Sequence, residues 1–537
     1  MSALWHGIAA RRGALITLGV AFIAAFASIA QLFPNHAGFQ SYDSSAYIFV
    51  ADGMLKGRIP YLQLWENKGM PLYALNILGR LITPGRFGGI WLLELLFVTL
   101  AFGGVIWTLR RIASIGATAL ACALLVVGIV LTAVGGNTPE LWNLAAQAAG
   151  LVLAWLLISG EWRAKRRLFV LSGFAAGFSG MMKISLLGTW VAVFCLLVAL
   201  AVARKIALRD ALQLLGMMAV GFLVAIALSV APIAAWGATS AWWDQWIGFG
   251  LNMKSHGVTG VRGSRLEALR ISLLRLLFIS ATLVAGLVVA GGGWLARRRP
   301  QLDSRRLWMG CFLAGWLGIE LWAASINGLS YIHYSMPWLI PLVTLVGLLF
   351  GGESVRWPGL VLAVVVVALS LWHVAPEFRS RLALSGGFPP VTRVDSVSRR
   401  EAQRLMIREV ESRTSPSDTV LVWGKDPIVF VETGRLSAGP YSHPLDILLT
   451  PGYQSERQFA AFMRDLETNP PRLIIDSAPL WNGDRASIPE LRVSTPTDTS
   501  AGRVQPYMGS LPDFVSARYR HYTTGNPRID YYELAGE

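Results

Sequence analysis

Long apolar segments separated by short polar ones run from residue 13 to residue 375 of the chain. A transmembrane helix needs about 20 consecutive apolar residues, and about eleven windows of that kind occur here. They cover residues 13–33, 88–109, 113–134, 140–159, 168–183, 185–203, 211–235, 271–296, 307–326, 333–351 and 357–375. The pattern predicts a mainly α-helical protein that crosses the membrane many times.

One apolar segment does not fit a membrane span. Residues Pro71 to Leu81 are too few to cross a bilayer and include Arg80, so we expect an amphipathic helix lying in the membrane interface. With this assignment the basic clusters between spans all fall on one side, which the excess of Lys and Arg identifies as the cytoplasm. These clusters lie at residues 11–12, 110–111, 163–167, 204–209 and 297–306. The loops 34–87 and 236–270 and the C-terminal tail are then external.

The composition becomes mixed and polar from Ala375 onward, which predicts a soluble domain. Residues 418–424 (DTVLVWG) and 472–478 (RLIIDSA) have the pattern of short buried strands, and residues 455–468 that of an amphipathic helix. Residues from about 482 to 530 are rich in Pro, Ser, Thr and Gly and are assigned no element. We therefore expect a membrane module over residues 1–375, including the external loop 34–87, and a small external α/β domain over residues 376–537.

Composition and charge support a membrane protein rather than a nucleic-acid-binding one. The chain has 54% hydrophobic and 15% charged residues and a mean hydropathy of +0.50. Its formal charge of +15 comes from short basic runs between apolar segments and not from one basic face. The three cysteines, Cys122, Cys195 and Cys311, lie far apart in apolar segments, without metal-binding spacing.

The polar stretch from Gln40 to Pro71 is the first candidate for chemistry. Asp43 precedes a helical pattern that Gly57 closes, so it is either a helix N-cap or a functional carboxylate. Glu66 and Lys68 follow in the same loop, in WENKGMP. A carboxylate base near a cation at a membrane surface suits a reaction on a phosphate-linked substrate.

Charged residues inside the predicted spans are the second candidate. They usually face a cavity because a charge facing lipid costs several kcal/mol, although long basic side chains can instead snorkel to the interface. The predicted topology places all of them in the external portions of their helices, which indicates a polar cavity opening outward. The residues are Glu94, Glu140, Lys183, Arg275 and Glu320.

Further polar residues are expected around the mouth of this cavity. One pair is Asn137 with Glu140, which are either substrate contacts or helix caps. The other is His333 with Tyr334, which are either substrate contacts or part of an interfacial aromatic belt. Arg262 and Arg265 belong to a basic stretch that would meet either a substrate phosphate or lipid headgroups. A transporter of lipid-linked sugar or another anion is an alternative use of such a cavity, although no paired broken spans in repeated halves favour it.

Several motifs in a fixed order resemble one known family. They are SYDSSAYIFVADGMLKGRIPYLQLWENKGMPLYALN, GGNTPELW, GFAAGFSGMMKIS, YIHYSMPWLIP and VLVWGKDPIVFVETGR, within roughly residues 10 to 440. This set resembles the bacterial GT-C membrane glycosyltransferases, in the branch related to protein O-mannosyltransferases and lipid A aminoarabinose transferases. The resemblance implies a polyprenyl-phosphate sugar donor and inverting transfer to an envelope lipid, glycan or protein on the external face of the inner (plasma) membrane.

The resemblance also implies roles for individual residues. Asp43 occupies the place of the presumed base, and Lys68 and Lys183 match basic residues that would bind the donor phosphate. Asn137 and Glu140 match a polar turn, with Pro139 inserted before the acid. The family often has a second acid directly after the first, where this chain has Ser44. No cofactor is required by the sequence, and metal dependence and any partner carboxylate of Asp43 stay open.

Overall fold

The computed structural model forms two compact units, and each is made of three separate parts of the chain. The first, here called the helical unit, comprises Met1–His36, Ile90–Ser229 and Arg265–Pro390. The second, here called the mixed unit, comprises Ala37–Gly89, Val230–Ser264 and Val391–Glu537. The structure describes residues 2–32, 42–84, 87–133, 135–256, 270, 303–325, 331–349, 394–482, 486–499, 502–524, 526 and 528–536.

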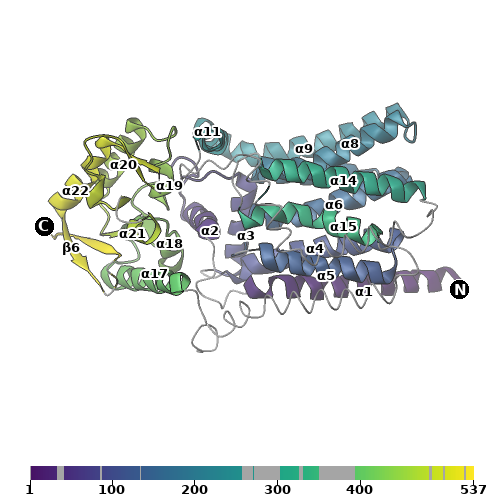
Figure 1. Cartoon of the computed structure of the whole chain (residues 1–537), viewed down its shortest axis with the longest axis horizontal. Coiled ribbons are helices and arrows are strands. Elements are labelled where there is room, and N and C mark those ends of the chain that lie inside the picture. Colours follow the sequence, from purple (N-terminus) through teal and green to yellow (C-terminus); the bar gives the residue numbers. More distant parts are fainter. Residues whose placement is uncertain are drawn as a thin grey trace. The chain divides into compact units, whose positions relative to one another are not determined.

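The helical unit is built mainly from α-helices that pack against one another (Figure 1). The α-helices are α1 (Ser2–Ile29), α4 (Gly88–Ile112), α5 (Ile115–Thr132), α6 (Pro139–Ser159), α7 (Arg167–Met182), α8 (Gly188–Val202), α9 (Leu208–Ala235), α14 (Ser304–Ser325) and α15 (Leu339–Leu349). Short helical turns flank them: η1 (Ala30–Leu32), η2 (Glu161–Lys165), η3 (Ile184–Leu187) and η5 (Ile332–Trp338).

Seven helical segments of the described residues are long and apolar enough to cross a membrane, which confirms a polytopic membrane protein. They correspond to the windows predicted at 88–109, 113–134, 140–159, 185–203, 211–235, 307–326 and 333–351. The windows at 13–33 and 168–183 correspond to shorter apolar helical segments, Gly13–Ile29 and Arg167–Met182. The windows at 271–296 and 357–375 lie outside the described residues.

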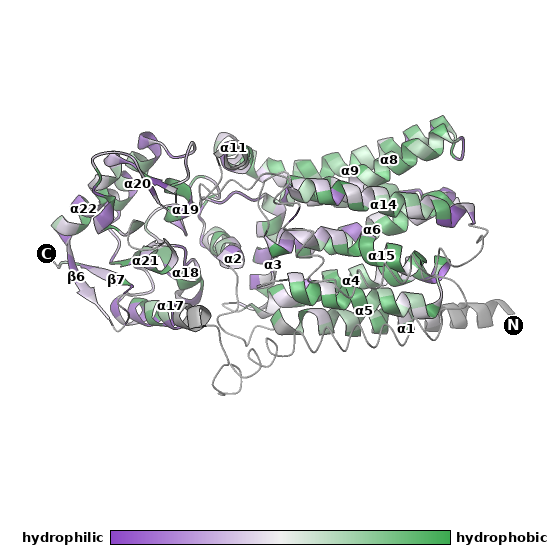
Figure 2. Cartoon of the chain, in the orientation of Figure 1, coloured by the Kyte–Doolittle hydropathy of each residue, from purple (hydrophilic) through white to green (hydrophobic). Residues whose placement is uncertain are grey.

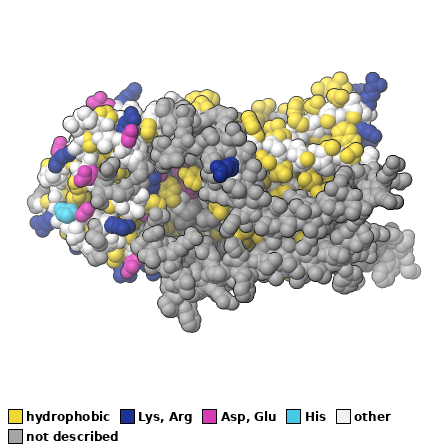
Figure 3. All heavy atoms as spheres, in the orientation of Figure 1, with side chains coloured by type: hydrophobic (Ala, Val, Ile, Leu, Met, Phe, Trp, Pro, Cys, Tyr) yellow, Lys and Arg dark blue, Asp and Glu magenta, His cyan; other side chains and the backbone are white. Residues whose placement is uncertain are grey.

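The outer surface of α8 and α9 is apolar along its length. Figure 3 shows hydrophobic side chains (yellow) gathered along these helices, and Figure 2 colours both helices mostly green for hydrophobic residues. The exposed side chains include Val191, Phe194, Val198, Leu212, Leu223 and Leu228. Exposed apolar side chains along a whole helix are expected where lipid takes the place of water.

Clusters of basic residues lie in the connections between consecutive helices of the helical unit. Arg110 and Arg111 end α4, the run 163–167 joins α6 to α7, and Arg204 and Lys205 stand between α8 and α9. Because consecutive helices run in alternate directions, these connections share one side of the helical unit. Lys183 and the turn before Glu140 belong to connections on the opposite side.

Glycines allow α7 and α9 to pack at very short range. A Cβ added at Gly173 would lie 1.9 Å from the carbonyl oxygen of Met218, and one at Gly221 would lie 1.9 Å from that of Val170. Small residues at such crossings let the backbones of membrane helices approach closely. The glycine-rich sequence GFAAGFSG therefore sets the place of α7, and with it that of Lys183 directly after the helix.

We expect Gly173→Ala to destabilise the helical unit, because the new methyl group would collide with backbone and not with a flexible side chain. Overpacking of this kind costs about 1–3 kcal/mol. The measurement is thermal unfolding of the purified protein, followed by tryptophan fluorescence. Gly216→Ala is the matched control on α9, since no described atom lies within 4 Å of a Cβ built there. Equal melting temperatures for the two variants would contradict the assigned crossing.

The mixed unit carries a five-stranded sheet in the order β2-β1-β3-β7-β6. Strands β1 (Thr419–Trp423), β2 (Leu436–Ser437) and β3 (Leu473–Asp476) are parallel, whereas β6 (Tyr519–Thr523) and β7 (Asp530–Leu534) add as antiparallel strands. Strands β4 (Thr497–Thr499) and β5 (Gly502–Val504) form a separate pair. The helices of this C-terminal part are α17 (Val394–Arg413), α18 (Ile428–Thr433), α19 (Pro444–Leu448), α20 (Glu456–Thr468), α21 (Ala478–Asn482) and α22 (Ser510–Arg518), with turns η8 (Pro489–Leu491) and η9 (Pro506–Gly509).

The predicted strands at 418–424 and 472–478 and the helix at 455–468 correspond to β1, β3 and α20. Residues 482–530, to which the sequence analysis assigned no element, contain β4, β5, α22 and β6. Short strands of polar composition do not stand out in a Pro- and Ser-rich sequence. They form here because their backbones pair with neighbours in a sheet.

The first loop packs with the C-terminal part inside the mixed unit. It forms α2 (Tyr42–Leu55) and α3 (Met70–Ile82), and the segment after α9 forms α10 (Thr239–Trp243), η4 (Asp244–Gly248) and α11 (Phe249–His256). Trp65 of the loop and Phe249 of α11 belong to the same hydrophobic core as Leu445 and Phe462. The backbone N–H of Trp65 also donates to the carbonyl of Pro440, at 2.8 Å.

The predicted helix over residues 71–81 is present as α3, which begins beside Gly69 with Pro71 in its first turn. Its Arg80 is buried and donates through Nε and Nη2 to the two carboxylate oxygens of Asp52, at 2.7 and 2.6 Å. Arg80 therefore serves to join α3 to α2. The interfacial position of α3 remains a prediction.

Candidate functional site

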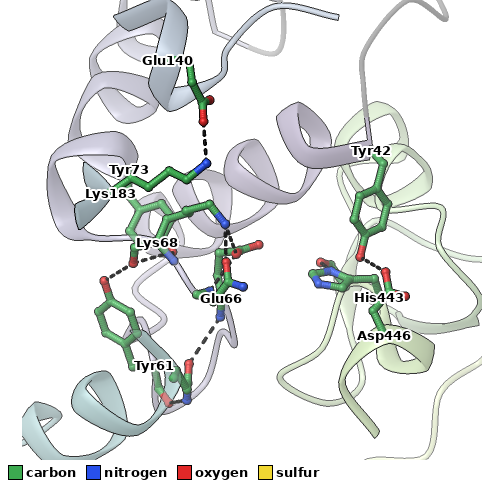
Figure 4. A network of polar contacts seen from close by, with 12 residues as sticks. Tyr42, Tyr61, Glu66, Lys68, Tyr73, Glu140, Lys183, His443 and Asp446 are labelled. Carbon is green, nitrogen blue, oxygen red and sulfur yellow. Dashed lines mark hydrogen bonds and ion pairs between the residues drawn. The ribbon is translucent and has the colours of Figure 1, made fainter. Parts of the chain in front are cut away.

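A buried ion pair forms where α7 ends. Lys183 leaves the helix in an extended conformation (φ −162°, ψ 124°), and its N–H still donates to the carbonyl of Ser179. Its side chain thereby reaches the first turn of α6, where Nζ lies 2.5 Å from Oε1 of Glu140 (Figure 4). The same Nζ lies 3.8 Å from the ring centroid of Tyr334, which adds a cation–π contact.

Glu140 is held rigidly and retains spare acceptor capacity. Thr138 caps α6 by accepting a hydrogen bond from the N–H of Leu141, and Pro139 occupies the first helical position. The Glu140 side chain is 2% exposed, and its Oε2 has no hydrogen-bond partner among the described residues. A carboxylate buried with one free oxygen is costly unless a ligand or water completes its contacts.

The pair opens into a pocket of the helical unit. Its lining comes from α6, η3, α14 and η5 and combines charged with apolar side chains. The lining residues are Glu140, Lys183, Ser185, Leu186, Glu320, Ala323, Ala324, Tyr334 and Pro337. Of the residues predicted from the sequence, Glu140, Lys183, Glu320 and Tyr334 thus share one pocket.

Glu320 forms part of the pocket wall, with one carboxylate oxygen occupied by neighbouring side chains. Its Oε1 accepts hydrogen bonds from Trp316 Nε1 (2.9 Å), Thr189 Oγ1 (3.2 Å) and Gln147 Nε2 (3.3 Å). A Cβ at Gly188 would lie 2.6 Å from its Oε2, so the glycine leaves room for the carboxylate in this position. Glu320 therefore ties α14 to α6 and α8 as well as lining the pocket.

Glu94 and Asn137 interact with each other and do not line the pocket. Gly135, Gly136 and Asn137 all have positive φ (81°, 68° and 53°), and the N–H of Asn137 donates to Oε1 of Glu94. The side-chain oxygen of Asn137 accepts from Trp142 Nε1 at 3.1 Å. The turn thus holds the Glu94 side chain through the backbone N–H of Asn137.

His333 stacks on Tyr331, with ring centroids 5.7 Å apart, and meets Tyr334 edge to face at 4.7 Å. It therefore supports the Tyr334 ring, which lines the pocket, and is not itself a lining residue. Arg262 and Arg265 lie outside the described residues, as does Arg275.

A second polar cluster lies in the mixed unit. Lys68 Nζ is 4.0 Å from Oε1 of Glu66 and donates to the side-chain oxygen of Asn67 (Figure 4). The Lys68 carbonyl accepts hydrogen bonds from the hydroxyls of Tyr61 (2.8 Å) and Tyr73 (3.1 Å). These two bonds fix the backbone from which Lys68 projects.

Glu66 is a carboxylate whose charge is disfavoured. Burial raises its pKa above the ordinary value, and the negative charges of Asp43 and Asp446 add to the rise, while Lys68 opposes it. Asp43 is half-buried inside the first turn of α2, which begins at Tyr42, so it does not occupy the capping position before the helix. Its carboxylate has no hydrogen bond or ion pair with any described residue.

Four residues near this cluster were not singled out from the sequence. The Tyr42 hydroxyl donates to Oδ2 of Asp446 at 2.6 Å, and Lys425 Nζ lies 2.5 Å from the other oxygen of Asp446. The His443 ring lies edge to face with Tyr42, with centroids 5.0 Å apart. One signal could have found Lys425, which follows the buried parallel strand β1 after a single glycine, since binding residues gather at the carboxyl ends of such strands.

The described residues contain no group of three or more His, Cys, Asp or Glu side chains placed to bind a metal ion. The lysines of the two clusters are Lys183 in the pocket and Lys68 and Lys425 in the mixed unit.

The long apolar helices of the chain have the GT-C fold. One solved structure with this fold is ArnT from Cupriavidus metallidurans bound to undecaprenyl phosphate. It has 14% sequence identity and a TM-score of 0.57, and the match covers 96% of this chain and 97% of that one. For the apo state of the same protein these values are 14%, 0.52, 87% and 93%. No protein-family model matches the chain, and no curated protein matches it in sequence.

Proposed function

We propose that the protein is an inverting glycosyltransferase that moves a sugar from a polyprenyl-phosphate donor to a hydroxyl or amine of a cell-envelope lipid, glycan or protein. The observation that carries the proposal is the Lys183–Glu140 pair in the pocket of a GT-C fold. The Lys183 ammonium is held in place by Glu140 and lies beside apolar side chains of the pocket. This combination suits a phosphate that is attached to a lipid chain. The bound undecaprenyl phosphate of ArnT, a protein with the same fold, supports this class of donor.

Lys183 would bind the donor phosphate by direct charge pairing. In the unliganded pocket its charge is balanced by Glu140 and by the Tyr334 ring. An arriving phosphate would share the ammonium with Glu140, because a lysine has three N–H donors. Lys68, half-buried and 4.0 Å from Glu66, is proposed as a further phosphate ligand, as are Arg262 and Arg265 from the sequence.

Asp43 would act as the general base. It takes the proton of the acceptor hydroxyl or amine while the acceptor atom bonds to the anomeric carbon of the sugar. The bond between that carbon and the phosphate oxygen breaks in the same step, and the polyprenyl phosphate leaves with the electron pair. Lys183 and Lys68 stabilise the charge that develops on the leaving phosphate. A single displacement inverts the anomeric configuration.

The reaction is proposed to occur on the external face of the inner membrane. The basic connections of the helical unit gather on the side opposite the end of α7 from which Lys183 projects. Clusters of Lys and Arg favour the cytoplasmic side. The pocket would then open externally, where envelope acceptors are assembled.

The test is the fate of the donor lipid. The purified protein in proteoliposomes is given a polyprenyl-phosphate sugar and an envelope lipid extract, and the lipids are analysed by mass spectrometry. We expect free polyprenyl phosphate and an acceptor heavier by one sugar. Movement of intact donor across the bilayer without bond cleavage would instead identify a transporter, which the buried charges of the pocket also suit.

A further inference from the structure

A chain of three side chains links the C-terminal part of the mixed unit to the start of α2. Lys425 Nζ lies 2.5 Å from Oδ1 of Asp446. Oδ2 of Asp446 accepts a hydrogen bond of 2.6 Å from the Tyr42 hydroxyl, and Figure 4 shows this bond. Tyr42 and Asp446 are 404 positions apart in the sequence. Tyr42 is the first residue of α2, and the next residue is Asp43.

The protonation states of Tyr42 and His443 favour a stable hydrogen bond between Tyr42 and Asp446. Burial raises the pKa of Tyr42 well above its ordinary value, and the charge of Asp446 raises it further, so the hydroxyl keeps its proton and donates. Burial lowers the pKa of His443 to about 4, so the ring beside Tyr42 is neutral at pH 7. Lys425 holds its charge partner Asp446 from the other side, and both are more than four-fifths buried. A hydrogen bond to a charged acceptor is about twice as strong as one between neutral groups.

The carboxylate of Asp43 depends on the position of its backbone, because the carboxylate itself forms no hydrogen bond or ion pair with a described residue. No described residue donates a hydrogen bond to it or pairs with it, so its position follows from the backbone of the first turn of α2. End turns of helices fray unless side chains hold them. A general base that is misplaced by about 1 Å loses on the order of 100-fold in rate.

We propose that Asp446 and Lys425 are positioning residues for the transfer reaction, and that they hold Asp43 in its reactive place through the Tyr42 hydroxyl. This inference rests on the proposed role of Asp43 as base. It assigns the C-terminal part of the mixed unit a direct part in turnover, in addition to any part in choosing the acceptor.

The test compares Tyr42→Phe, Asp446→Asn and the double variant. We expect each to lower kcat about 10- to 100-fold with little change in the KM of the donor, because the base and not the phosphate site is disturbed. The double variant should be no slower than the slower single one, since Tyr42→Phe removes this hydrogen bond and Asp446→Asn removes the acceptor charge that strengthens the same bond. Tyr522→Phe is the matched control, because it deletes another tyrosine–carboxylate hydrogen bond of the mixed unit, to Glu409 at 3.2 Å.

A readout other than turnover separates positioning from a general loss of structure. Hydrogen–deuterium exchange of a peptide covering residues 42–55 should rise in Tyr42→Phe and Asp446→Asn and stay unchanged in Tyr522→Phe. Unchanged exchange with normal kcat would overturn the proposal. A raised KM for the acceptor with normal kcat would overturn it as well, because these residues would then bind the acceptor directly.

Combining the changes with Asp43→Asn distinguishes this inference from the proposed function. If Asp43→Asn is inactive and Tyr42→Phe is fully active, the base assignment stands and the positioning role is wrong. If Asp43→Asn is itself active, the base assignment fails. In the Asp43→Asn background we expect Tyr42→Phe to cause no further loss, and an additional loss there would show that Tyr42 acts by another route.

Discussion

Replacing Asp43 by Asn is expected to reduce glycosyl transfer about 100- to 10,000-fold, the usual contribution of a general base. An amide of the same shape cannot take the acceptor proton, whereas the proposed phosphate ligands Lys68 and Lys183 remain in place. The measurement is the initial rate of free polyprenyl phosphate release in proteoliposomes. Donor affinity, measured separately, should change little, because Asp43 carries no described contact that organises Lys68 or Lys183.

Asp513→Asn is a suitable control for this experiment. It makes the same chemical change at a carboxylate of the mixed unit that is 70% exposed and paired only at the surface with Arg492. Such pairs contribute little, so the rate and the melting temperature should both be unchanged. If Asp43→Asn transfers sugar at near wild-type rate, another group must accept the proton, and Glu66 is the buried carboxylate of the same cluster.

The second large effect is expected at Lys183. Removing one partner of a buried charge pair at a binding site costs about 2–5 kcal/mol, so Lys183→Ala should weaken binding of polyprenyl phosphate about 30-fold or more. The measurement is a dissociation constant for polyprenyl phosphate, determined with the protein in nanodiscs. Lys165→Ala is the control, since this lysine is 43% exposed and its pair with Glu161 lies at the surface.

Lys183→Ala also leaves the Glu140 carboxylate buried without its cation, which by itself destabilises the fold. The double variant Lys183→Met with Glu140→Gln removes both charges and keeps the approximate shapes of the side chains. We expect it to recover the melting temperature of the wild type without recovering donor binding. Recovery of binding together with stability would mean that Lys183 has only a structural role.

The membrane architecture follows from the sequence because burial in lipid acts on each segment separately. A window of apolar residues is apolar whatever it packs against, so the windows at 88–109 or 211–235 correspond to helices α4 and α9. The strands β1 and β3 were predictable for a similar reason, since continuous runs of branched apolar residues suit a sheet buried on both faces. The polar strands β4 to β6 depend on pairing with other strands and gave no such local signal.

The candidate site was predictable only as a set of residue types. Glu140 and Lys183 stood out because charged groups within apolar segments are costly, and that cost is a local property of the sequence. Asp43 and Lys68 stood out as a carboxylate and a cation in one polar loop and through the family resemblance. Their partners are not local. Glu94 looked equivalent to Glu140, but the structure pairs it with the turn at Asn137, while Glu140 pairs with Lys183 in the pocket.

Which carboxylate meets which cation depends on the rotation and depth of each packed helix, and a pattern of apolar positions does not specify these. The α7–α9 crossing sets the depth of Lys183, and Gly188 leaves the space that Glu320 fills. The bond between Tyr42 and Asp446 joins segments that are distant in the chain and brings Lys425 and His443 beside the first loop. The sequence by itself thus determined the spans, two of the strands and the candidate charges, whereas the partners of those charges were decided by tertiary packing, because hydrogen bonds and ion pairs act only between groups that the fold has already brought together.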